Sequence, residues 1–178
     1  MTFQANGLTI ECVQGDITKQ NDMDAVVNAA NAELQSGGGV AGAIHAAAGP
    51  ELAQACRALA PIRPGEAVIT EAFNLPNRYV IHCLGPVYGR DEEAATLLAS
   101  CYHQALELAE EKQLDSVAFP AISTGAFGFP MDYAAEVASR AVLAKSGELD
   151  SVSRIRWVLF SDEDRDLHKG VFEQMFNA

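Results

Sequence analysis

The chain has 178 residues, of which 24 are acidic and 12 are basic, so its formal net charge is −12. This length fits one domain, residues 1–178, and the 49% hydrophobic content is enough for a core. Nucleic-acid affinity depends on Lys and Arg neutralising phosphates, so the charge excludes a general nucleic-acid binder. No apolar run approaches the roughly 20 residues that cross a bilayer, and the N-terminus lacks a secretory signal, so we expect a cytoplasmic protein without membrane contact.

The four cysteines show no pattern of metal or disulfide chemistry. Cys12, Cys56, Cys83 and Cys101 have neither CxxC nor Cys/His spacing, and each lies in an apolar or helical run. A free cysteine in such a run behaves as a small core residue. We therefore expect reduced, structural cysteines, no metal site and no cofactor.

Strand and helix patterns alternate along the chain. Apolar and β-branched runs predict strands at 8–14, 25–28, 66–73, 79–84, 117–121 and 155–160. Amphipathic or alanine-rich runs predict helices at 40–48, 50–59, 91–112, 130–145 and 167–176.

This alternation is typical of an α/β fold. It predicts a three-layer α/β/α sandwich around a central sheet of about six strands. Such sheets bind ligands in a crevice beyond the carboxyl ends of their strands. Two segments follow strands in this way, residues 28–40 and 123–129.

The first segment, Asn28-Ala-Ala-Asn31, is followed by Gly37-Gly38-Gly39-Val40. Three consecutive glycines suit a place where the backbone approaches a ligand or adopts positive φ. Because they immediately precede a predicted helix, their N–H groups and the helix dipole can point at a phosphate. A flexible loop without a ligand is the alternative interpretation.

The second segment, Ser123-Thr124-Gly125-Ala126-Phe127-Gly128, also joins a buried strand to a helix N-terminus. Phe127 lies among small residues, where an aromatic ring can cover a sugar or can instead fold back under its own loop. Two anion cradles at one end of a sheet indicate a ligand with a diphosphate. Neither segment has the Gly-Lys-Ser/Thr of a phosphate-binding P-loop, and the glycine run is not GxGxxG.

A third short segment, Gly15-Asp16-Ile17-Thr18, follows the first predicted strand. The Asp16 carboxylate can accept hydrogen bonds from an adenine amino group, which would select a purine ligand. Asp and Thr beside Gly are also frequent turn and N-cap residues, and the residues alone favour that second interpretation.

Taken together, these motifs resemble the macrodomain family. The ordered series is GDIT (15–18), VVNAAN (26–31), SGGGVAGAIHAAAGPEL (36–52), GEAVIT (65–70), YVIHCLGPVYG (79–89), FPAISTGAFGFP (119–130) and VLFSDED (158–164). The series spans nearly the whole chain. The resemblance implies the macrodomain fold, with a mixed sheet, and ADP-ribose as the ligand.

The resemblance also implies roles for individual residues. Asp16 and the Ile17 N–H would hold the adenine, and Phe160 would stack on it. Asn31 would bind the distal ribose, and Phe127 would lie near that sugar. The full set implied to contact ADP-ribose is Asp16, Ile17, Asn28, Asn31, Gly37, Gly38, Gly39, Val40, Ser123, Thr124, Gly125, Ala126, Phe127 and Phe160.

One position departs from the MacroD-type hydrolases, in which the glycine run is followed by Val-Asp-Gly. Here the sequence is Val40-Ala41-Gly42, and alanine can neither accept a proton nor orient water. His45, four residues after Ala41 on the same helix face, is the nearest candidate for proton transfer, although packing alone also accounts for it. The catalytic group expected from the sequence is thus Asn31, Gly38, Phe127 and His45. His82 is expected to be structural, and His103 and His168 to lie on helix surfaces.

We expect an enzyme that hydrolyses esters of ADP-ribose. The candidate substrates are O-acetyl-ADP-ribose and mono-ADP-ribose attached to acidic side chains of proteins. Two alternatives stay open: a non-catalytic reader of ADP-ribose or ADP-ribosylated proteins, which Ala41 favours, and a phosphatase acting on ADP-ribose-1″-phosphate, with the same pocket and a different leaving group.

Overall fold

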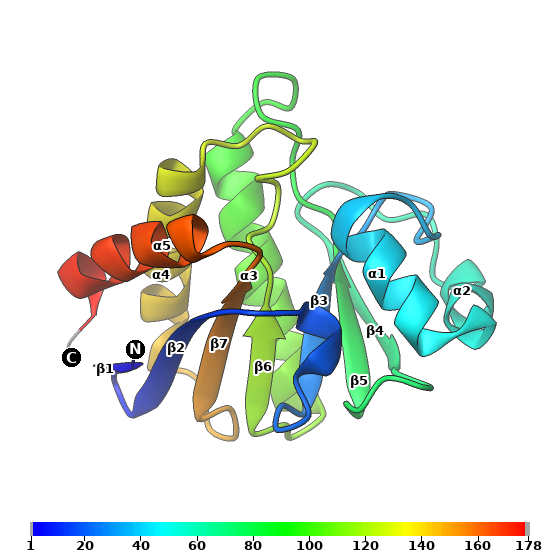
Figure 1. Cartoon of the computed structure of the whole chain (residues 1–178), viewed down its shortest axis with the longest axis horizontal. Helices are drawn as coiled ribbons and strands as arrows, with labels where there is room; N and C mark the ends of the chain where they lie inside the picture. Colours follow the sequence, from blue (N-terminus) through cyan, green and yellow to red (C-terminus); the bar gives the residue numbers. More distant parts are fainter. Residues whose placement is uncertain (1, 177–178) are drawn as a thin grey trace.

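The computed structural model describes residues 2–176, and its centre is one seven-stranded sheet (Figure 1). The strand order is β1-β2-β7-β6-β3-β5-β4. The five inner strands run parallel, whereas the edge strands β1 and β4 pair antiparallel with their neighbours. The bounds are β1 Thr2–Ala5, β2 Leu8–Gln14, β3 Ala25–Ala29, β4 Ala67–Glu71, β5 Tyr79–Cys83, β6 Ser116–Phe119 and β7 Arg154–Leu159.

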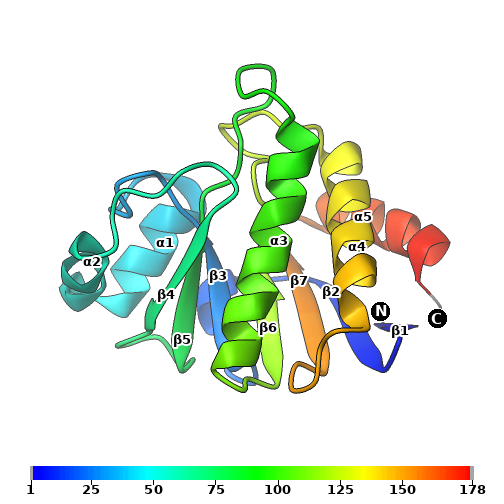
Figure 2. The same cartoon turned by 180° about the vertical axis from the view of Figure 1, so that it is seen from behind.

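Helices cover both faces of this sheet. The bounds are α1 Gly39–Ala48, α2 Pro50–Arg57, α3 Ala94–Glu111, α4 Met131–Ser146 and α5 Asp162–Met175, with a short 3₁₀ helix η1 at Ile17–Lys19. Figure 1 shows α1 and α2 on one face, and Figure 2 shows α3 and α4 on the other. The side chains of α5 pack into the same core as α3 and α4. The predicted three-layer α/β/α arrangement is confirmed.

The strands separate two cores because successive side chains point to opposite faces of a sheet. On β3, Ala25 and Val27 belong to the core under α3, α4 and α5, whereas Val26 belongs to the core under α1 and α2. The larger core contains Trp157, whose ring lies 4.9 Å from that of Phe172 on α5. Polar residues on the Val26 side therefore face α1 and α2.

Two elements differ most from the sequence prediction. A seventh strand, β1, forms a hairpin with β2, so the predicted sheet was one strand short. The turn between them is Asn6-Gly7, with φ of 48° and 86°, which suits the right-handed twist of paired strands. The last helix begins at Asp162 rather than at 167, because Ser161 caps it by accepting a hydrogen bond from the Asp164 N–H at 3.1 Å.

The topology brings the sequence segments to one edge of the sheet. β3 and β6 are hydrogen-bonded neighbours, so the loops that follow them lie side by side. β2 and β7 are also neighbours, which places Gly15-Asp16 next to Phe160. Over residues 2–176, no helix combines the length and the apolar character needed to cross a membrane.

Candidate functional site

The glycine loop after β3 ends at the N-terminus of α1. Gly38 is the N-cap residue, and no side chain caps the first turn, so the early N–H groups of this helix are left for other partners. Gly39 has a φ of +56°, a conformation that glycine adopts at a lower cost than other residues. Gly38 does not, since its φ is −87° and a Cβ there would meet nothing within 4 Å. Neither packing nor backbone geometry explains the glycine at position 38, whereas close approach of a ligand does.

The loop after β6 repeats this arrangement. Ser123 in this loop has a φ of +68°, and its buried hydroxyl has no hydrogen-bond partner among the described residues. Gly85 makes room for it, since a Cβ there would clash with the Ser123 hydroxyl. A Cβ at Gly125 would again meet only open space. Strain and an unpartnered polar group together are typical of a functional loop.

The backbone of this second loop leaves donors free. Within the described residues, the N–H groups of Gly125, Ala126 and Phe127 donate no hydrogen bond, whereas Gly128 and Phe129 do. The Thr124 hydroxyl is occupied, since it donates to the Ala121 carbonyl at 2.7 Å. The Phe127 carbonyl accepts from the Tyr88 N–H at 2.9 Å. Three successive free N–H groups form a cradle for an anion.

Asp16 and Phe160 follow two neighbouring strands, β2 and β7, at the other end of this edge. The Gly15 N–H donates to the Leu159 carbonyl at 3.0 Å, which joins the two chain segments. Phe160 is 91% exposed, an unusual position for a large aromatic ring in the absence of a partner. An aromatic face beside a carboxylate edge suits a flat heterocycle that carries an amino group.

Asp16 also caps η1, as the turn interpretation predicted. Its Oδ1 accepts from the Thr18 N–H at 2.9 Å and from the Thr18 hydroxyl at 2.6 Å. These two hydrogen bonds lower the pKa of the Asp16 carboxyl, so it is a carboxylate at neutral pH. Ile17 is buried, so only its backbone can contact a ligand.

Sequence reasoning did not identify the residues that hold Asp16 in place. Gln20 donates to the Asp16 carbonyl at 2.8 Å and accepts from Arg156 at 2.9 Å. Arg156 also pairs with Asp22 at 2.7 Å and with Glu11 at 3.2 Å. The available signal was a pair of arginines in an otherwise apolar strand, Arg154-Ile-Arg-Trp-Val-Leu159, since charged side chains in a half-buried strand need partners.

Asn31 lies beside the glycine loop, but its side chain is engaged within the loop. Its Nδ2 donates to the Gln35 carbonyl at 2.8 Å, and its Oδ1 accepts from the Gln35 N–H at 3.1 Å. Between them, the buried Leu34 has a φ of +56°. Asn31 therefore closes a strained turn that leads directly into Gly37. It keeps one further donor and one further acceptor for a ligand.

Asn28 is not exposed to a ligand in this structure. It is fully buried on the α1 and α2 side of β3, where its amide contacts the His82 Nδ1 at 3.1 Å. The His82 Nε2 lies 3.0 Å from the Thr70 hydroxyl and 3.7 Å from the Cys56 Sγ. Side chains alternate between the two faces along β3, and this alternation places Asn28 in the interior. The structure therefore does not support direct contact between Asn28 and a ligand. Burial lowers the pKa of His82 to about 3, so this histidine is neutral and structural, as expected.

His45 and Ala41 share the buried face of α1, together with Ile44 and Ala48. The His45 Nε2 is buried without a hydrogen-bond partner in the described residues, and burial lowers the pKa of this ring. His45 follows Gly39 by six residues, which corresponds to about 9 Å along a helix axis. His45 therefore lies almost two helical turns beyond the first N–H groups of α1, although it lines a surface hollow together with Ser36 of the loop.

The remaining histidines and the cysteines are structural. His168 was expected on a helix surface but is buried, with Nδ1 2.9 Å from the Asp164 carbonyl and its ring against Phe172. His103 is half-buried and contacts the Ala141 carbonyl at 3.1 Å. All four cysteines are free and buried. Within residues 2–176, no group of three His, Cys, Asp or Glu side chains could hold a metal ion.

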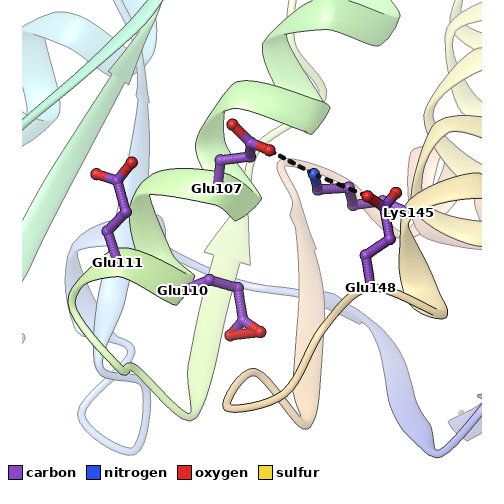
Figure 3. A pocket seen from close by; sticks show the side chains of 5 residues that line it. All are labelled: Glu107, Glu110, Glu111, Lys145 and Glu148. Carbon is purple, nitrogen blue, oxygen red and sulfur yellow. Dashed lines mark hydrogen bonds and ion pairs between the residues drawn. The ribbon is translucent and has the colours of Figure 1, made fainter.

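A hollow of about 250 Å³ at the C-terminal ends of α3 and α4 is a poor alternative site. Figure 3 shows its five side chains: Glu107, Glu110, Glu111, Lys145 and Glu148. The single ammonium is already paired, with Nζ 2.8 Å from Glu107 and 3.9 Å from Glu148. Four carboxylates around one neutralised lysine repel a diphosphate.

Comparison with known proteins identifies the family. A family model described as Macro domain matches residues 27–138, and the chain belongs to the macrodomain family. A macro domain-containing protein from Ralstonia nicotianae is 51% identical over 147 residues, which cover 82% of this chain and 85% of the relative. A macro domain-containing protein from Listeria monocytogenes is 48% identical over 168 residues, covering 90% of this chain and 95% of the relative.

Solved structures give the same result. A variant of the Oceanobacillus iheyensis macrodomain with ADPR matches with a TM-score of 0.93 and 40% identity, covering 98% of this chain and 97% of that one. The Trypanosoma brucei macrodomain in complex with ADP-ribose matches with a TM-score of 0.83 and 32% identity, covering 92% of this chain and 68% of that one. The macrodomain fold expected from the motifs is thereby confirmed.

Proposed function

We propose that this macrodomain binds ADP-ribose. The observation that carries the proposal is the pair Gly38 and Gly125, one in each loop. Both would accept a side chain without a clash or a backbone penalty, yet both are glycine. A ligand that approaches both loops closely accounts for this, and the free N–H groups beside each glycine suit the two phosphates of a diphosphate.

The ends of the site fit the rest of this ligand. Asp16 and Phe160 offer a hydrogen-bond acceptor and an exposed ring for the adenine. Asn31 and the half-buried Phe127 lie at the opposite, glycine-rich end, where the distal ribose would lie. The ADPR and ADP-ribose bound to the two macrodomains above support this assignment by similarity.

The reaction we propose is hydrolysis of an ester on the distal ribose. The candidate substrates are O-acetyl-ADP-ribose and mono-ADP-ribose attached to an acidic side chain. One water adds across the ester and returns a ribose hydroxyl and a free carboxylic acid, whichever C–O bond breaks. No carboxylate follows the glycine run, since Ala41 stands there and is buried. A ligand phosphate that orients the water, with Asn31 and the glycine loop holding the ribose, supplies a route through positioning alone.

The same alanine favours a second function, that of a non-catalytic reader. A reader needs only the cradle, the adenine end and Asn31. It requires no group that moves a proton, and neither Ala41 nor the separated His45 supplies one at the glycine loop.

Turnover of the two ester substrates separates these functions. The wild-type protein is incubated with O-acetyl-ADP-ribose and with a mono-ADP-ribosylated glutamate peptide, and ADP-ribose release is followed by chromatography. We expect release by the wild type and a loss of at least about tenfold in Asn31→Ala, because the ribose loses a hydrogen-bonding partner worth about 1.4 kcal/mol or more.

Two controls accompany this experiment. Asn21→Ala, at an exposed asparagine outside both loops, is expected to retain wild-type turnover. Calorimetry with ADP-ribose reports binding independently of turnover. Tight binding without release of product would establish the reader, and absence of binding at millimolar ADP-ribose would contradict the site itself.

A further inference from the structure

Gln20 is a buried polar residue that joins the two sides of the adenine end. It is the C-cap residue of η1, and its Nε2 donates to the Asp16 carbonyl at 2.8 Å. Its Oε1 accepts from the Arg156 Nη1 at 2.9 Å. Arg156 belongs to β7, the strand that leads into Phe160, and β7 lies beside β2 in the sheet (Figure 1). One amide side chain thereby connects the turn that carries the carboxylate with the strand that carries the exposed ring.

The guanidinium of Arg156 determines which way this amide faces. A guanidinium only donates hydrogen bonds, so the Gln20 oxygen faces Arg156 and the Gln20 NH₂ group is left for the Asp16 carbonyl. The guanidinium is itself held from two sides. Its Nη1 and Nη2 contact the two carboxylate oxygens of Asp22 at 2.8 and 2.7 Å, and Nη2 lies 3.2 Å from the Glu11 Oε1. Such two-pronged pairing fixes the orientation of the guanidinium as well as its charge.

Stability alone is a poor explanation for this network. The Arg156 side chain is 11% exposed, and the desolvation of a charge at such a depth offsets much of its attraction to the carboxylates. Hydrogen bonds from Arg156 hold the pKa of the Asp22 carboxyl well below its usual range. The pair therefore stays charged at neutral pH and constrains geometry throughout that range.

The Asp16 carboxylate keeps one oxygen for a base. The Thr18 N–H and hydroxyl both donate to Oδ1, at 2.9 and 2.6 Å, whereas Oδ2 accepts no hydrogen bond within the described residues. The Asp16 carbonyl is held by Gln20 and also by the Lys19 N–H at 3.0 Å. With the main chain and Oδ1 both held, the direction of Oδ2 is set. That direction matters because a hydrogen bond weakens steeply as its angle departs from linearity.

We propose that Gln20 is a positioning residue that makes the site selective for a purine with an exocyclic amino group over a purine with an oxygen at that position. Gln20 acts by holding Asp16 so that Oδ2 accepts from the amino group, and Arg156 acts by orienting Gln20. The inference rests on the proposed function and concerns its base rather than its ester. An oxygen in place of the amino group only accepts hydrogen bonds, so the Asp16 carboxylate repels it.

The test compares ADP-ribose with inosine diphosphate ribose, in which an oxygen replaces the adenine amino group. Calorimetry gives the Kd of each ligand. We expect the wild type to bind ADP-ribose at least about tenfold more tightly, because the hydrogen bond to a charged acceptor is lost in the second ligand. The ratio of the two Kd values, called here the adenine preference, is the measured quantity.

Two substitutions of Gln20 remove its donor. Gln20→Glu keeps the length of the side chain and its pairing with Arg156 but turns an oxygen towards the Asp16 carbonyl. Its added charge acts on both diphosphates equally and cancels in the ratio. Gln20→Met removes the donor without adding a charge. The Gln20 carbonyl accepts from the Asn77 Nδ2 at 2.8 Å, so its main chain remains held in both variants. Each is expected to lower the adenine preference by at least about threefold.

Two arginines on β7 provide a matched control. Both Arg154 and Arg156 pair with acidic side chains, namely Glu11 and Asp22. Within the described residues, only Arg156 contacts Gln20. Arg156→Met frees the Gln20 amide to rotate and is expected to lower the adenine preference, whereas Arg154→Met is expected to keep it. Thermal unfolding reports the stability of each variant. An equal fall in both variants would assign the effect to general loosening of the strand and overturn the proposal.

An Asp16→Ala background shows whether Gln20 acts through Asp16. Removal of the carboxylate is expected to abolish most of the adenine preference, and Gln20→Glu is expected to change it no further in that background. A Gln20 that only supports the fold would have the same effect with and without the carboxylate. That result, or an unchanged preference in both Gln20→Glu and Gln20→Met, would overturn the positioning role.

Failure of this inference is distinguishable from failure of the proposed function. Absence of ADP-ribose binding by the wild type would contradict the ADP-ribose site and this inference with it. Binding of ADP-ribose and inosine diphosphate ribose with equal affinity would overturn the positioning role alone, and the cradle for the diphosphate would stand.

Discussion

Replacing Gly38 by alanine separates folding from ligand binding at a single residue. The new methyl group points into open space at a φ that alanine adopts freely, so we expect an unchanged melting temperature. The methyl group would occupy the space of the diphosphate, so ADP-ribose affinity is expected to fall by at least about tenfold. Calorimetry and thermal unfolding measure the two effects.

Gly147→Ala is the matched control for that experiment. Gly147 also faces open space at an ordinary φ of −70°, but it lies at the end of α4. It is expected to change neither affinity nor stability appreciably. If Gly38→Ala binds ADP-ribose with the affinity of the wild type, the proposed anion cradle at the glycine loop is contradicted.

At this scale, the sequence predicts which residues reach the ligand edge but not how each is engaged. Asn28 and Asn31 belong to one motif, yet β3 ends between them, so Asn28 is interior and Asn31 lies in the loop. The contact of Asn28 with His82 joins residues 54 positions apart, and no local pattern encodes such a pair. No local pattern encodes the 91% exposure of Phe160 either, since this residue directly follows the apolar, buried end of β7.

At the scale of the element, the fit between α1 and its preceding loop depends on Gly42. Alanine usually stabilises a helix interior relative to glycine by up to about 1 kcal/mol. Here its Cβ would meet the Gly37 carbonyl, so the loop must move away from α1. We expect Gly42→Ala to weaken ADP-ribose binding several-fold while far-UV circular dichroism remains helical.

Gly170→Ala in α5 provides the contrast, since a Cβ at Gly170 meets nothing within 4 Å. That variant is expected to raise the urea midpoint slightly and to leave affinity unchanged. If Gly42→Ala behaves in the same way as Gly170→Ala, the close contact between helix and loop does not control the site.

Elements with a strong apolar period were predicted to within a few residues, and β2 was predicted at its observed bounds of Leu8–Gln14. β1 was missed because it has only four residues, and only Phe3 and Ala5 point inward. Such a short strand shows too little alternation of apolar and polar residues to be recognised. The Asn6-Gly7 turn was the better signal. The predicted bound of α5 at residue 167 was late because Asp162, Glu163 and Asp164 carry no apolar face, although the interpretation of these acids as a solvated N-terminal turn that suits the helix dipole is confirmed.

Across the whole molecule, buried histidines make stability depend on pH. His82 has a pKa of about 3 when folded and an ordinary value of 6.5, and burial also lowers the pKa of His45 and His168. The unfolded chain therefore binds more protons below pH 6.5. The stabilisation is fully present above that pH and is lost as the pH falls towards the folded values, at about 1.4 kcal/mol per pH unit for His82.

Urea unfolding at pH 7.5, 6.0 and 5.0 measures this dependence above the range in which carboxylates begin to titrate. His82→Gln is expected to have a lower free energy of unfolding than the wild type at pH 7.5. As the pH falls, its free energy of unfolding is expected to decline less steeply, because about one proton fewer is taken up on unfolding. The same slope in His82→Gln and in the wild type would show that His82 is not the group that takes up the proton.

The pairing of β2 with β7 has a consequence for how the protein is made. It joins residues as far apart as Glu11 and Arg156, which are separated by 145 positions. A growing chain that lacks β7 cannot form the hydrogen bond between Gly15 and Leu159. It also cannot pair Arg156 with the residues that hold Asp16 in place. The Asp16 end of the candidate site is therefore complete only after β7 has been made. Free ligand in the cell then favours completed chains over partial ones, since it stabilises only the form that has the finished site.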